Sequence, residues 1–259
     1  MKKNNNINLK KVPPKFKSII RKMVKIILAE SKDTRAIVLI GSVADNTYKK
    51  SSDIDLVWAK SHKIGYKRQG KMEERLNSYS QRKIQLVPFT TKQILWHFAS
   101  ASTMAHSIQQ GIVIYGKEDR LISEFLAKKL HLPTREWMKH WFSHWLRRYR
   151  WAKDSIKREK QYHKKYCKGD CHCTVFDDIA RVSVNFTILY LETQNIIPVS
   201  KNQIWQNIQK LSSKLNREVL EGIKLALKFS GKDKYLTLAQ ADKILISANY
   251  LKKNLEKNT

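Results

Sequence analysis

The spacing of apolar residues divides the chain into two parts. Up to about residue 118, short apolar runs typical of strands alternate with segments whose apolar residues have helical spacing. The pattern predicts strands at 36–40, 53–58, 83–89 and 112–115, and helices at 14–31, 64–80 and 91–101. This alternation indicates an α/β unit.

After Gly116 the apolar spacing becomes helical almost everywhere. One apolar stripe predicts the buried face of a long helix, and its members are Met138, Phe142, Trp145, Tyr149, Ala152 and Ile156. Further helices are predicted near 120–131, 174–195, 201–213, 216–229 and 236–255. We therefore expect an α/β domain over 1–118 and an all-α helical bundle over 119–259.

The charge is strongly positive in both parts. The chain has 51 Lys and Arg against 22 Asp and Glu, a formal net charge of +29. Residues 1–119 hold 23 basic and 9 acidic groups (+14), and residues 120–259 hold 28 and 13 (+15). Such a surface attracts polyanions such as nucleic acid or nucleotides. Alternatively, a general bias of the amino-acid composition toward Lys, Asn and Ile would give the same charge without any binding role. Both readings stay open at this point.

Several classes of protein are disfavoured. The longest apolar runs, such as 36–40, are far too short for a membrane span, and the start MKKNNNINLKK lacks the apolar region of a secretory signal. We therefore expect a cytoplasmic protein with no membrane partner. The cysteines are odd in number, namely Cys167, Cys171 and Cys173, which makes them a poor set for disulfide pairing. With His163 and His172 they leave open either a zinc site or ordinary loop cysteines.

The segment GSVADNTYKKSSDIDLV, residues 41–57, carries the strongest chemical signal. In a strand, Asp53 and Asp55 point the same way while Ile54 and Leu56 point into the core. Two carboxylates this close repel each other unless a cation lies between them, and oxygen ligands beside phosphates suit Mg²⁺. Backbone N–H groups and the hydroxyl at Gly41-Ser42 can hold phosphates. Phosphates and metal ligands are thus expected at one point.

This segment resembles the Gly-Ser…Asp-x-Asp signature of the DNA polymerase β-like nucleotidyltransferase superfamily. Asp45, Lys49 and Ser52 look like the streptomycin/spectinomycin adenylyltransferase branch. The layout of the whole chain is also similar to that branch, to the kanamycin nucleotidyltransferases and to HEPN-type bundles. The resemblance implies a small mixed sheet in the first domain.

The resemblance also implies an activity, namely Mg²⁺-dependent transfer of a nucleoside monophosphate from a nucleoside triphosphate, with ATP expected, to an unidentified acceptor. Asp53 and Asp55 would hold the metal. The nucleotide would be bound by Gly41, Ser42, Lys49 and Ser52.

The chain departs from the family at three places. Asp45 stands where many relatives have an Arg. In the strand 83–89, Gln85 stands where the family places a third carboxylate, and an amide cannot take a proton. The RxxxxxH ribonuclease motif is absent, because no His follows Arg181 at that spacing, so the bundle is not expected to be a nuclease.

Two alternatives follow from the Gln85 substitution and the layout. The chain could be a nucleotide- or RNA-binding protein of the same fold without turnover, or an antitoxin-like AMP transferase acting on a protein. Asp177 and Asp178 are the candidates in the second half to replace the lost carboxylate. RNA or another anionic acceptor is the expected partner, and a homodimer stays open.

The run 147–168 carries ten basic and two acidic residues, interleaved with aromatic ones. This composition is typical of a nucleic-acid-binding helix. Because Trp145 and Tyr149 belong to the apolar stripe, a solvated basic face is the alternative.

Overall fold

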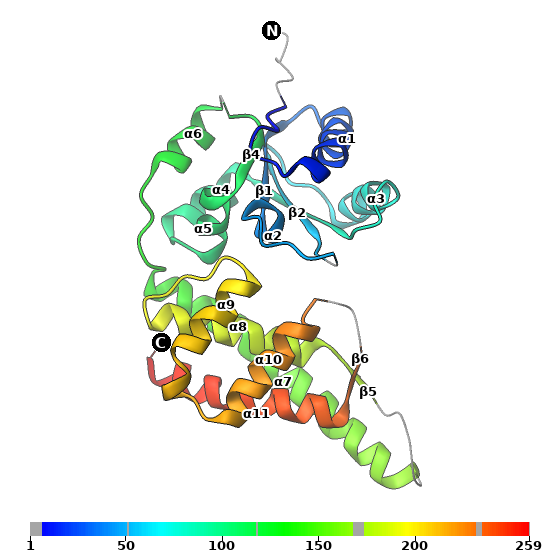
Figure 1. Ribbon diagram of the computed structural model, residues 1–259, viewed down its shortest axis with the longest axis vertical. Coiled ribbons are helices and arrows are strands. Elements are labelled where there is room, and N and C mark those ends of the chain that lie inside the picture. The colour runs from blue at the N-terminus through cyan, green and yellow to red at the C-terminus, as the bar shows by residue number, and fades with distance from the viewer. Residues whose placement is uncertain (1–6, 51, 118, 168–173, 232–234, 259) are drawn as a thin grey trace. The chain divides into compact units, whose positions relative to one another are not determined.

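The computed structural model describes residues 7–50, 52–117, 119–167, 174–231 and 235–258 (Figure 1). The chain folds as two compact units, residues 1–131 and 132–259. The elements of the first unit are α1 (Pro14–Glu30), β1 (Thr34–Ile40), α2 (Gly41–Ala44), β2 (Ile54–Lys60), α3 (Tyr66–Asn77), β3 (Ile84–Thr90), α4 (Thr91–Ala99), α5 (Thr103–Gln110), β4 (Ile112–Tyr115) and α6 (Arg120–Ala127). Within the described residues of both units, no helix is long and apolar enough to cross a bilayer.

The first unit is built on a mixed sheet with strand order β3-β2-β1-β4. Strands β1 and β2, and β1 and β4, are antiparallel, whereas β2 and β3 are parallel and are joined through α3. Residues alternate between the two faces, as the strand period requires. The small mixed sheet that the resemblance implies is thus confirmed.

Helices cover both faces of this sheet (Figure 1). On one face, α1 and α3 pack against the alternate residues of β1 and β2, among them Leu39, Ile54 and Leu56, all fully buried. On the other face, α4 and α5 pack against Val38 and Val57. The burial of both faces explains why β1 and β2 read as nearly continuous apolar runs.

Helix α6 packs with the first unit. Asp119, at its N-cap, pairs with Arg35 of β1 at 2.9 Å, and Phe125 stacks on Phe98 of α4 with ring centroids 4.9 Å apart. The boundary between the two compact units therefore falls at residues 131–132, farther along the chain than the boundary at 118 expected from the change of apolar spacing.

The second unit is mainly helical, as expected. Its elements are α7 (Arg135–Tyr166), β5 (Thr174–Phe176), α8 (Asp178–Thr193), α9 (Lys201–Lys210), the 3₁₀ turn η1 (Ser212–Lys214), α10 (Arg217–Phe229), β6 (Tyr235–Thr237) and α11 (Leu238–Asn258). Helix α8 contacts α7, α9, α10 and α11. Its Phe186 is fully buried and lies 5.6 Å from Phe142 and 5.9 Å from Tyr149, measured between ring centroids. The predicted apolar stripe of α7 therefore faces the core.

Two predicted helices begin later than expected. Thr174–Phe176 and Tyr235–Thr237 form a short antiparallel pair of strands instead of first helical turns. Val175 and Leu236 are buried side by side, whereas Phe176 and Tyr235 are exposed and their rings meet edge to face at 5.7 Å. Burial thus alternates with the strand period, and runs of three residues are too short to show it in the sequence.

Candidate active site

Gly41 turns the chain from β1 into the short helix α2. Its φ of +70° lies in the left-handed region, which favours glycine. A Cβ atom at this position would lie 2.8 Å from Oδ2 of Asp55. The absence of a side chain at Gly41 therefore lets the Asp55 carboxylate lie directly against the turn, and the expected meeting of the Gly-Ser turn with this carboxylate is present in the structure.

The two candidate metal ligands lie at the start of β2. Asp53 directly precedes the strand and Asp55 is its second residue, and both are partly exposed. Between and after them, Ile54 and Leu56 are fully buried in the core. The alternation anticipated from the sequence is therefore what the structure has.

Gln85 occupies the neighbouring position on β3. In the parallel pairing of β2 and β3 it is the register partner of Asp55, and its side chain is exposed. On the other side of β2, Asp55 is paired with Ile40, the last residue of β1. Asp55 thus lies between the end of β1 and the strand position where a third carboxylate was expected.

The described part of the chain holds no group of three or more His, Cys, Asp or Glu side chains that could bind a metal ion. Two carboxylates nevertheless fit Mg²⁺, which is commonly held by one or two carboxylates together with waters and substrate phosphates. The donor set at Asp53 and Asp55 is therefore suited to a magnesium–nucleotide complex rather than to an all-protein metal cage.

The loop between α2 and β2 is held by its own side chains. Asp45 Oδ1 accepts hydrogen bonds from the backbone N–H of Thr47 at 3.0 Å and from its hydroxyl at 2.6 Å. Ser52 Oγ accepts from the backbone N–H of Lys49 at 2.7 Å. Asp45 therefore has a structural role in the loop. Ser52, predicted to bind the nucleotide, stabilises the loop and retains its O–H as a donor.

Arg82, just before β3, holds the same loop in place. The sequence analysis did not predict this role of Arg82. Its guanidinium donates to the carbonyl oxygens of Lys49 at 3.0 Å and Ser52 at 2.9 Å. The guanidinium also lies 5.1 Å from the ring centroid of Phe16. Because Ser52 immediately precedes Asp53, Arg82 restrains the position of the first carboxylate. No motif in the sequence pointed to this contact, which depends on the tertiary fold.

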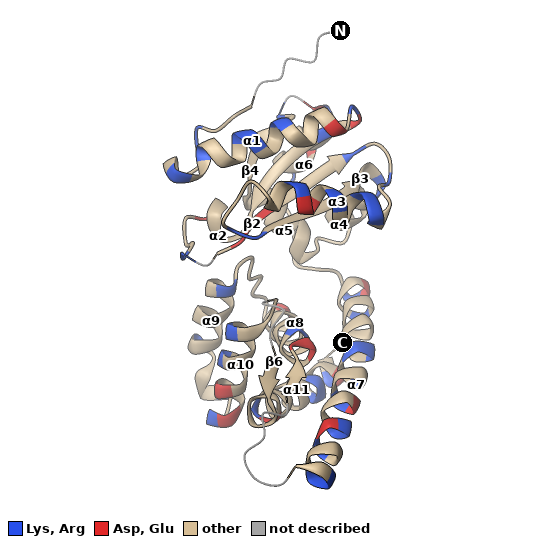
Figure 2. Cartoon of the chain, turned by 90° about the vertical axis from the view of Figure 1, so that its right-hand side faces the viewer, with Lys and Arg blue, Asp and Glu red and all other residues tan. Residues whose placement is uncertain are grey.

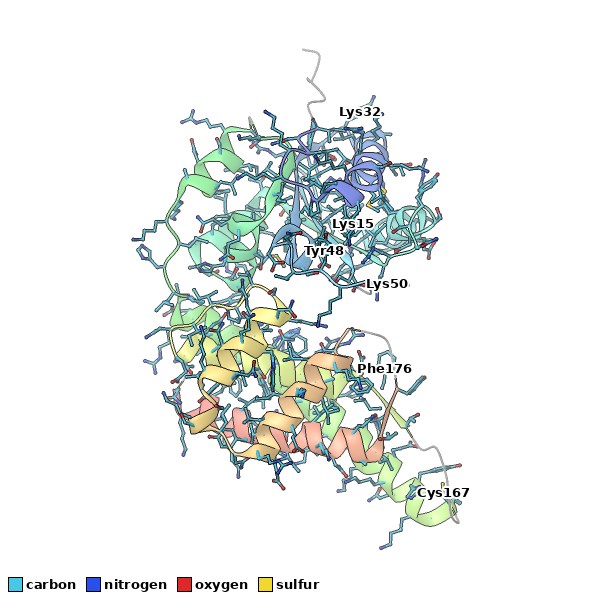
Figure 3. All side chains as sticks on the ribbon, viewed as in Figure 1. Lys15, Lys32, Tyr48, Lys50, Cys167 and Phe176 are labelled. Carbon is cyan, nitrogen blue, oxygen red and sulfur yellow. The ribbon has the colours of Figure 1, made fainter. Side chains whose placement is uncertain are left out.

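A second contact ties the loop to α1. The ammonium of Lys15 lies 3.9 Å from the ring centroid of Tyr48, a cation–π contact (Figure 3). Beyond Tyr48, the side chains of Lys49 and Lys50 are exposed. The loop backbone is therefore anchored, while its two lysines are exposed to solvent.

The two candidate acids of the second unit, Asp177 and Asp178, lie at the start of α8. Asp177 is fully buried and accepts hydrogen bonds from Nε of Arg181 and from the backbone N–H of Gly231, both at 3.0 Å. Asp178 begins α8, and burial raises its pKa even though Arg148 and Arg181 act in the opposite direction. Asp177 is therefore committed to bonds within its own unit.

The candidate zinc cluster is only partly within the described residues. Cys167 follows α7, and its backbone N–H donates to the carbonyl of His163 at 3.0 Å. Cys171, His172 and Cys173 lie outside the described residues. The zinc hypothesis therefore stays a prediction.

Comparison with known proteins identifies the first unit. Residues 22–120 match the model of the family described as Polymerase beta, Nucleotidyltransferase. This segment of the chain is therefore a polymerase β-type nucleotidyltransferase domain, and the resemblance seen in the sequence is confirmed. No curated protein matches the chain.

Among solved structures, the chain is similar to spectinomycin adenyltransferase AAD(9) from Enterococcus faecialis, solved with ATP and spectinomycin. The identity is 16%, the match covers 92% of this chain and 98% of that one, and the TM-score is 0.55. This likeness shows a shared fold over both units.

Two toxin–antitoxin structures also match part of the chain. One, solved with AMP-PNP, has 22% identity over 41% of this chain and 79% of that one, with a TM-score of 0.33. The other contains a tri-AMPylated Shewanella oneidensis HEPN toxin with its MNT antitoxin, and has 17% identity over 42% of this chain and 82% of that one, with a TM-score of 0.31.

Proposed function

We propose that this protein transfers a nucleoside monophosphate from a nucleoside triphosphate, ATP in the first instance, to a hydroxyl of an acceptor. The observation that supports this proposal is the Asp55 carboxylate lying against the Gly41 turn, with Asp53 beside it, in a polymerase β-type domain. In the reaction, the acceptor oxygen bonds to the α-phosphorus, the bond to the β-phosphate oxygen breaks, and pyrophosphate leaves.

The chain's own residues have distinct roles in this proposal. Asp53 and Asp55 hold the magnesium–nucleotide complex, and Gly41 and Ser42 contact the β- and γ-phosphates. Lys49, which is exposed on the loop before Asp53, contacts the triphosphate as well. Bound Mg²⁺ supplies positive charge that stabilises the transferring phosphate and the leaving pyrophosphate.

Gln85 limits the proposed reaction. As the register partner of Asp55, it occupies the place of a general base, but its amide can accept a hydrogen bond and cannot take the proton of the acceptor hydroxyl. The proton therefore passes to solvent, and we propose that transfer is slow. The same residue supports a second candidate function, a nucleotide-binding protein of this fold without turnover.

The acceptor is proposed to be neutral or anionic. The related AAD(9) structure contains spectinomycin, but residues 120–259 of this chain have a charge balance of +15, from 28 basic and 13 acidic groups. A polycationic acceptor needs carboxylates to offset the cost of desolvating its ammonium groups. RNA or a phosphorylated metabolite therefore suits the chain better than an aminoglycoside.

The test is incorporation of label from α-labelled ATP, together with release of pyrophosphate, by the full chain with Mg²⁺ and a set of hydroxyl acceptors. Asp53→Ala and Asp55→Ala are each expected to abolish transfer while the unfolding midpoint stays near that of the wild type. Glu74→Ala, which removes an exposed carboxylate of α3, is the matched control and should transfer normally. Undiminished transfer in both Asp variants would contradict the assignment of Asp53 and Asp55 as metal ligands.

The role of Gln85 has its own test. Gln85→Glu is expected to raise the transfer rate by about 10²–10⁴-fold, because it supplies a general base beside Asp55. Gln81→Glu, an exposed position just before β3, is the control and should leave the rate unchanged. If the wild type binds ATP but releases no pyrophosphate until Gln85 is replaced, the binding function is the correct one.

A further inference from the structure

The long helix α7 has two very different faces. Its buried residues are Trp137, Phe142, Trp145, Tyr149, Ala152 and Ile156. None of its residues after Ile156 is buried, so the last ten residues, 157–166, contribute little to the core. The exposed face along 147–166 therefore needs an explanation other than packing.

Three large aromatic side chains lie on this part of α7 in contact with solvent. Trp151, Tyr162 and Tyr166 are 55%, 56% and 58% exposed. The rings of Tyr162 and Tyr166 lie 4.8 Å apart between centroids. These rings differ from Trp145 and Tyr149 of the same helix, which are buried. The aromatic residues of the run 147–168 thus divide into core residues and a separate exposed set.

Two of the three exposed aromatics, Trp151 and Tyr162, share one stripe with basic residues, and Tyr166 lies beside it against Tyr162. At 100° per residue, Arg147, Trp151, Arg158, Tyr162 and Lys165 fall within an arc of about 60°. This stripe, named here the α7 stripe, runs about 27 Å along the axis at 1.5 Å per residue. Blue segments recur along α7 in Figure 2.

Further exposed basic residues lie on one flank of α7, between the α7 stripe and the buried face. They are Arg150, Lys153, Lys157 and Lys164.

The acidic groups near the α7 stripe are few. Within α7, Asp154 lies just outside one edge of the stripe, and Glu159 lies farther from it and is partly buried. From the neighbouring helix α11, Asp242 is paired with Lys160 at 2.6 Å. The stripe therefore keeps a clear excess of positive charge.

We propose that the α7 stripe binds single-stranded nucleic acid, with phosphates on its arginines and lysines and bases stacked on Trp151 and Tyr162 of the stripe and on Tyr166 beside it. Cations alone would attract any polyanion, but exposed rings at intervals among them match the combination of charge and stacking that binds unpaired bases. A duplex would hide the faces of its bases from these rings. The inference goes beyond the proposed function, because it involves none of the residues of the candidate active site.

An anionic membrane surface fits the α7 stripe less well. A helix that binds at a bilayer surface inserts a continuous apolar face. The apolar face of α7 is instead buried against α8 and α11, and its exposed face is charged between the separate rings. The aromatic side chains of the stripe are therefore suited to contact bases one at a time.

The test measures binding of a fluorescein-labelled 20-nucleotide uridine RNA to the full chain by anisotropy at several salt concentrations. The wild type is expected to bind with an affinity that falls as salt rises. Trp151→Ala and Tyr162→Ala should each weaken binding by roughly 5- to 100-fold, the fold-change that corresponds to loss of one base–ring stack. Trp151→Phe and Tyr162→Phe keep a ring and should stay close to the wild type.

A matched pair of triple variants separates the stripe from the general charge. Arg147→Glu, Arg150→Glu and Arg158→Glu together should weaken binding strongly. They should also make the salt dependence shallower, reducing the magnitude of the slope of log K against log salt by about 2. The control triple reverses the same number of exposed charges in the first unit, at Arg21, Lys25 and Lys71, and should have a much smaller effect. Equal losses in the two triple variants would overturn the proposal, as would alanine variants of Trp151 and Tyr162 that bind like the wild type.

Other probes identify the ligand and separate this inference from the proposed function. A 20-nucleotide thymidine DNA tests whether the sugar matters, since both strands offer phosphates and bases. Tighter binding to a duplex or to vesicles containing anionic lipid than to the single strands would overturn the proposal. Asp53→Ala, expected to lack transfer, should bind the RNA like the wild type.

Discussion

At the scale of single residues, Gly41 couples the turn after β1 to the Asp55 carboxylate. Gly41→Ala would place a Cβ atom 2.8 Å from Oδ2 of Asp55 and hold a non-glycine residue at a φ of +70°. The left-handed conformation alone costs roughly 1–2 kcal/mol in a residue with a side chain. We expect Gly41→Ala to lose at least this much unfolding free energy in urea titrations and to lose nucleotide transfer.

Gly70→Ala in α3 is the matched control for this prediction. Nothing lies within 4 Å of a Cβ atom there, and the position is helical. The change should therefore stabilise the protein by about 0.5–1 kcal/mol and leave transfer unaltered. If both variants behaved alike, the close approach of Asp55 to the Gly41 turn would be refuted.

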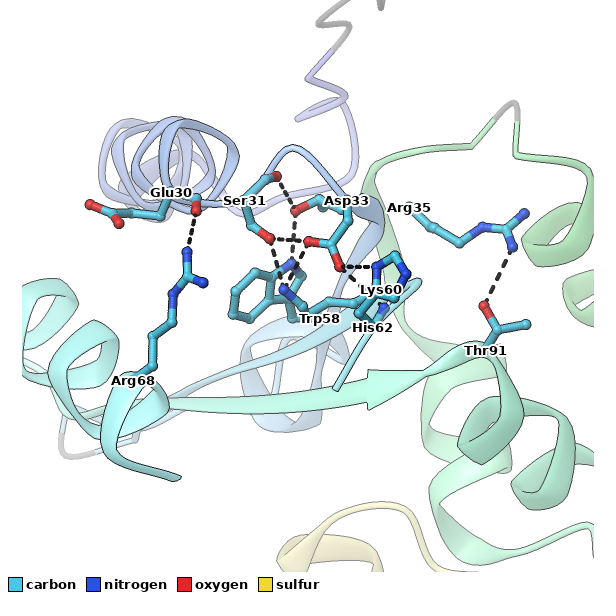
Figure 4. Close-up of polar contacts among 10 residues, drawn as sticks. Glu30, Ser31, Asp33, Arg35, Trp58, Lys60, His62, Arg68 and Thr91 are labelled. Carbon is cyan, nitrogen blue, oxygen red and sulfur yellow. Dashed lines mark hydrogen bonds and ion pairs between the residues drawn. The ribbon is translucent and has the colours of Figure 1, made fainter. Parts of the chain in front are cut away.

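A second group of residues ties the α1–β1 turn to the far end of β2 (Figure 4). Lys60 is 4% exposed and donates to Ser31 Oγ at 2.7 Å and to Asp33 Oδ1 at 2.9 Å. Burial acts to raise the pKa of Asp33, but hydrogen bonds from Ser31 and Lys60 outweigh it and hold that pKa well below its usual range. A carboxylate with a depressed pKa stabilises the fold above its unfolded pKa near 4 and loses this contribution as pH falls.

Asp33→Asn therefore tests an electrostatic contribution. At pH 7 it should lower the unfolding free energy by about 2 kcal/mol, because the Lys60 ammonium remains buried without its counter-charge. Between about pH 5 and pH 3, stability should fall less steeply in Asp33→Asn than in the wild type. Urea titrations across this range measure both effects. Lys63→Ala, which removes an exposed side chain just after β2, is the control and should change little. Parallel pH curves for wild type and Asp33→Asn would contradict the prediction.

The residues of the candidate site and the residues that make long-range polar contacts differ in how well the sequence predicts them. Gly41, Asp53 and Asp55 follow from local rules, since a turn after a buried strand and a carboxylate pair at alternate positions are visible within 17 residues. The contacts of Arg82 and of Asp33 with Lys60 join segments that are 27 or more residues apart. Only the tertiary fold brings such groups together, so no local pattern predicts them.

At the scale of elements, segments with a clear apolar pattern were predicted well, and those whose pattern is hidden by a neighbouring element were not. The helix predicted at 14–31 is α1 (Pro14–Glu30), and the strand at 112–115 is β4 (Ile112–Tyr115). Helix α5 (Thr103–Gln110) was missed, although Ser102 caps it through its side chain, because it follows α4 after only a few residues. The parallel pairing of β2 with β3, which puts Gln85 beside Asp55, also lies beyond any single-strand pattern.

Helix pairing in the second unit depends on a close approach at Gly222. A Cβ atom there would lie 2.5 Å from the carbonyl oxygen of Lys243 and 2.7 Å from Cβ of Ser247, both on α11. Ser247 is itself fully buried and hydrogen-bonded at 3.1 Å to Ser183 of α8. Three helices therefore meet where α10 has no side chain, and because α10 also packs against α8, a shift of α10 away from α11 would change that packing as well.

We expect Gly222→Ala to lower the unfolding free energy by about 1–3 kcal/mol, the usual cost of overpacking a core, in spite of the higher helix propensity of alanine. Chemical denaturation followed by circular dichroism measures the change. Gly70→Ala, with open space around it, provides the comparison of opposite sign. An unchanged or raised stability of Gly222→Ala would show that α10 and α11 do not approach this closely.

At the scale of the whole molecule, positive charge is spread over both units, and this charge is the basis of our proposal for the acceptor. The net charge is +29, and residues 120–259 alone contribute +15 from 28 basic and 13 acidic groups. Among the acids of the second unit, Asp177 is fully buried and paired with Arg181, and Glu192 is 3% exposed. These two carboxylates are therefore not available to receive the ammonium groups of a cationic ligand.

We therefore expect kanamycin and streptomycin to bind weakly, without saturation, in calorimetric titrations of the full chain with ATP and Mg²⁺ present. The reason is that each buried ammonium group needs a compensating carboxylate, and the bundle's surplus of Lys and Arg repels a polycation instead. Raising the salt concentration should not weaken aminoglycoside binding, because screening reduces a repulsion, whereas it should weaken RNA binding steeply. Tight, saturable binding of either aminoglycoside, with an affinity that falls as salt rises, would show that a local acidic pocket outweighs the net charge and would reverse the assignment of the acceptor class.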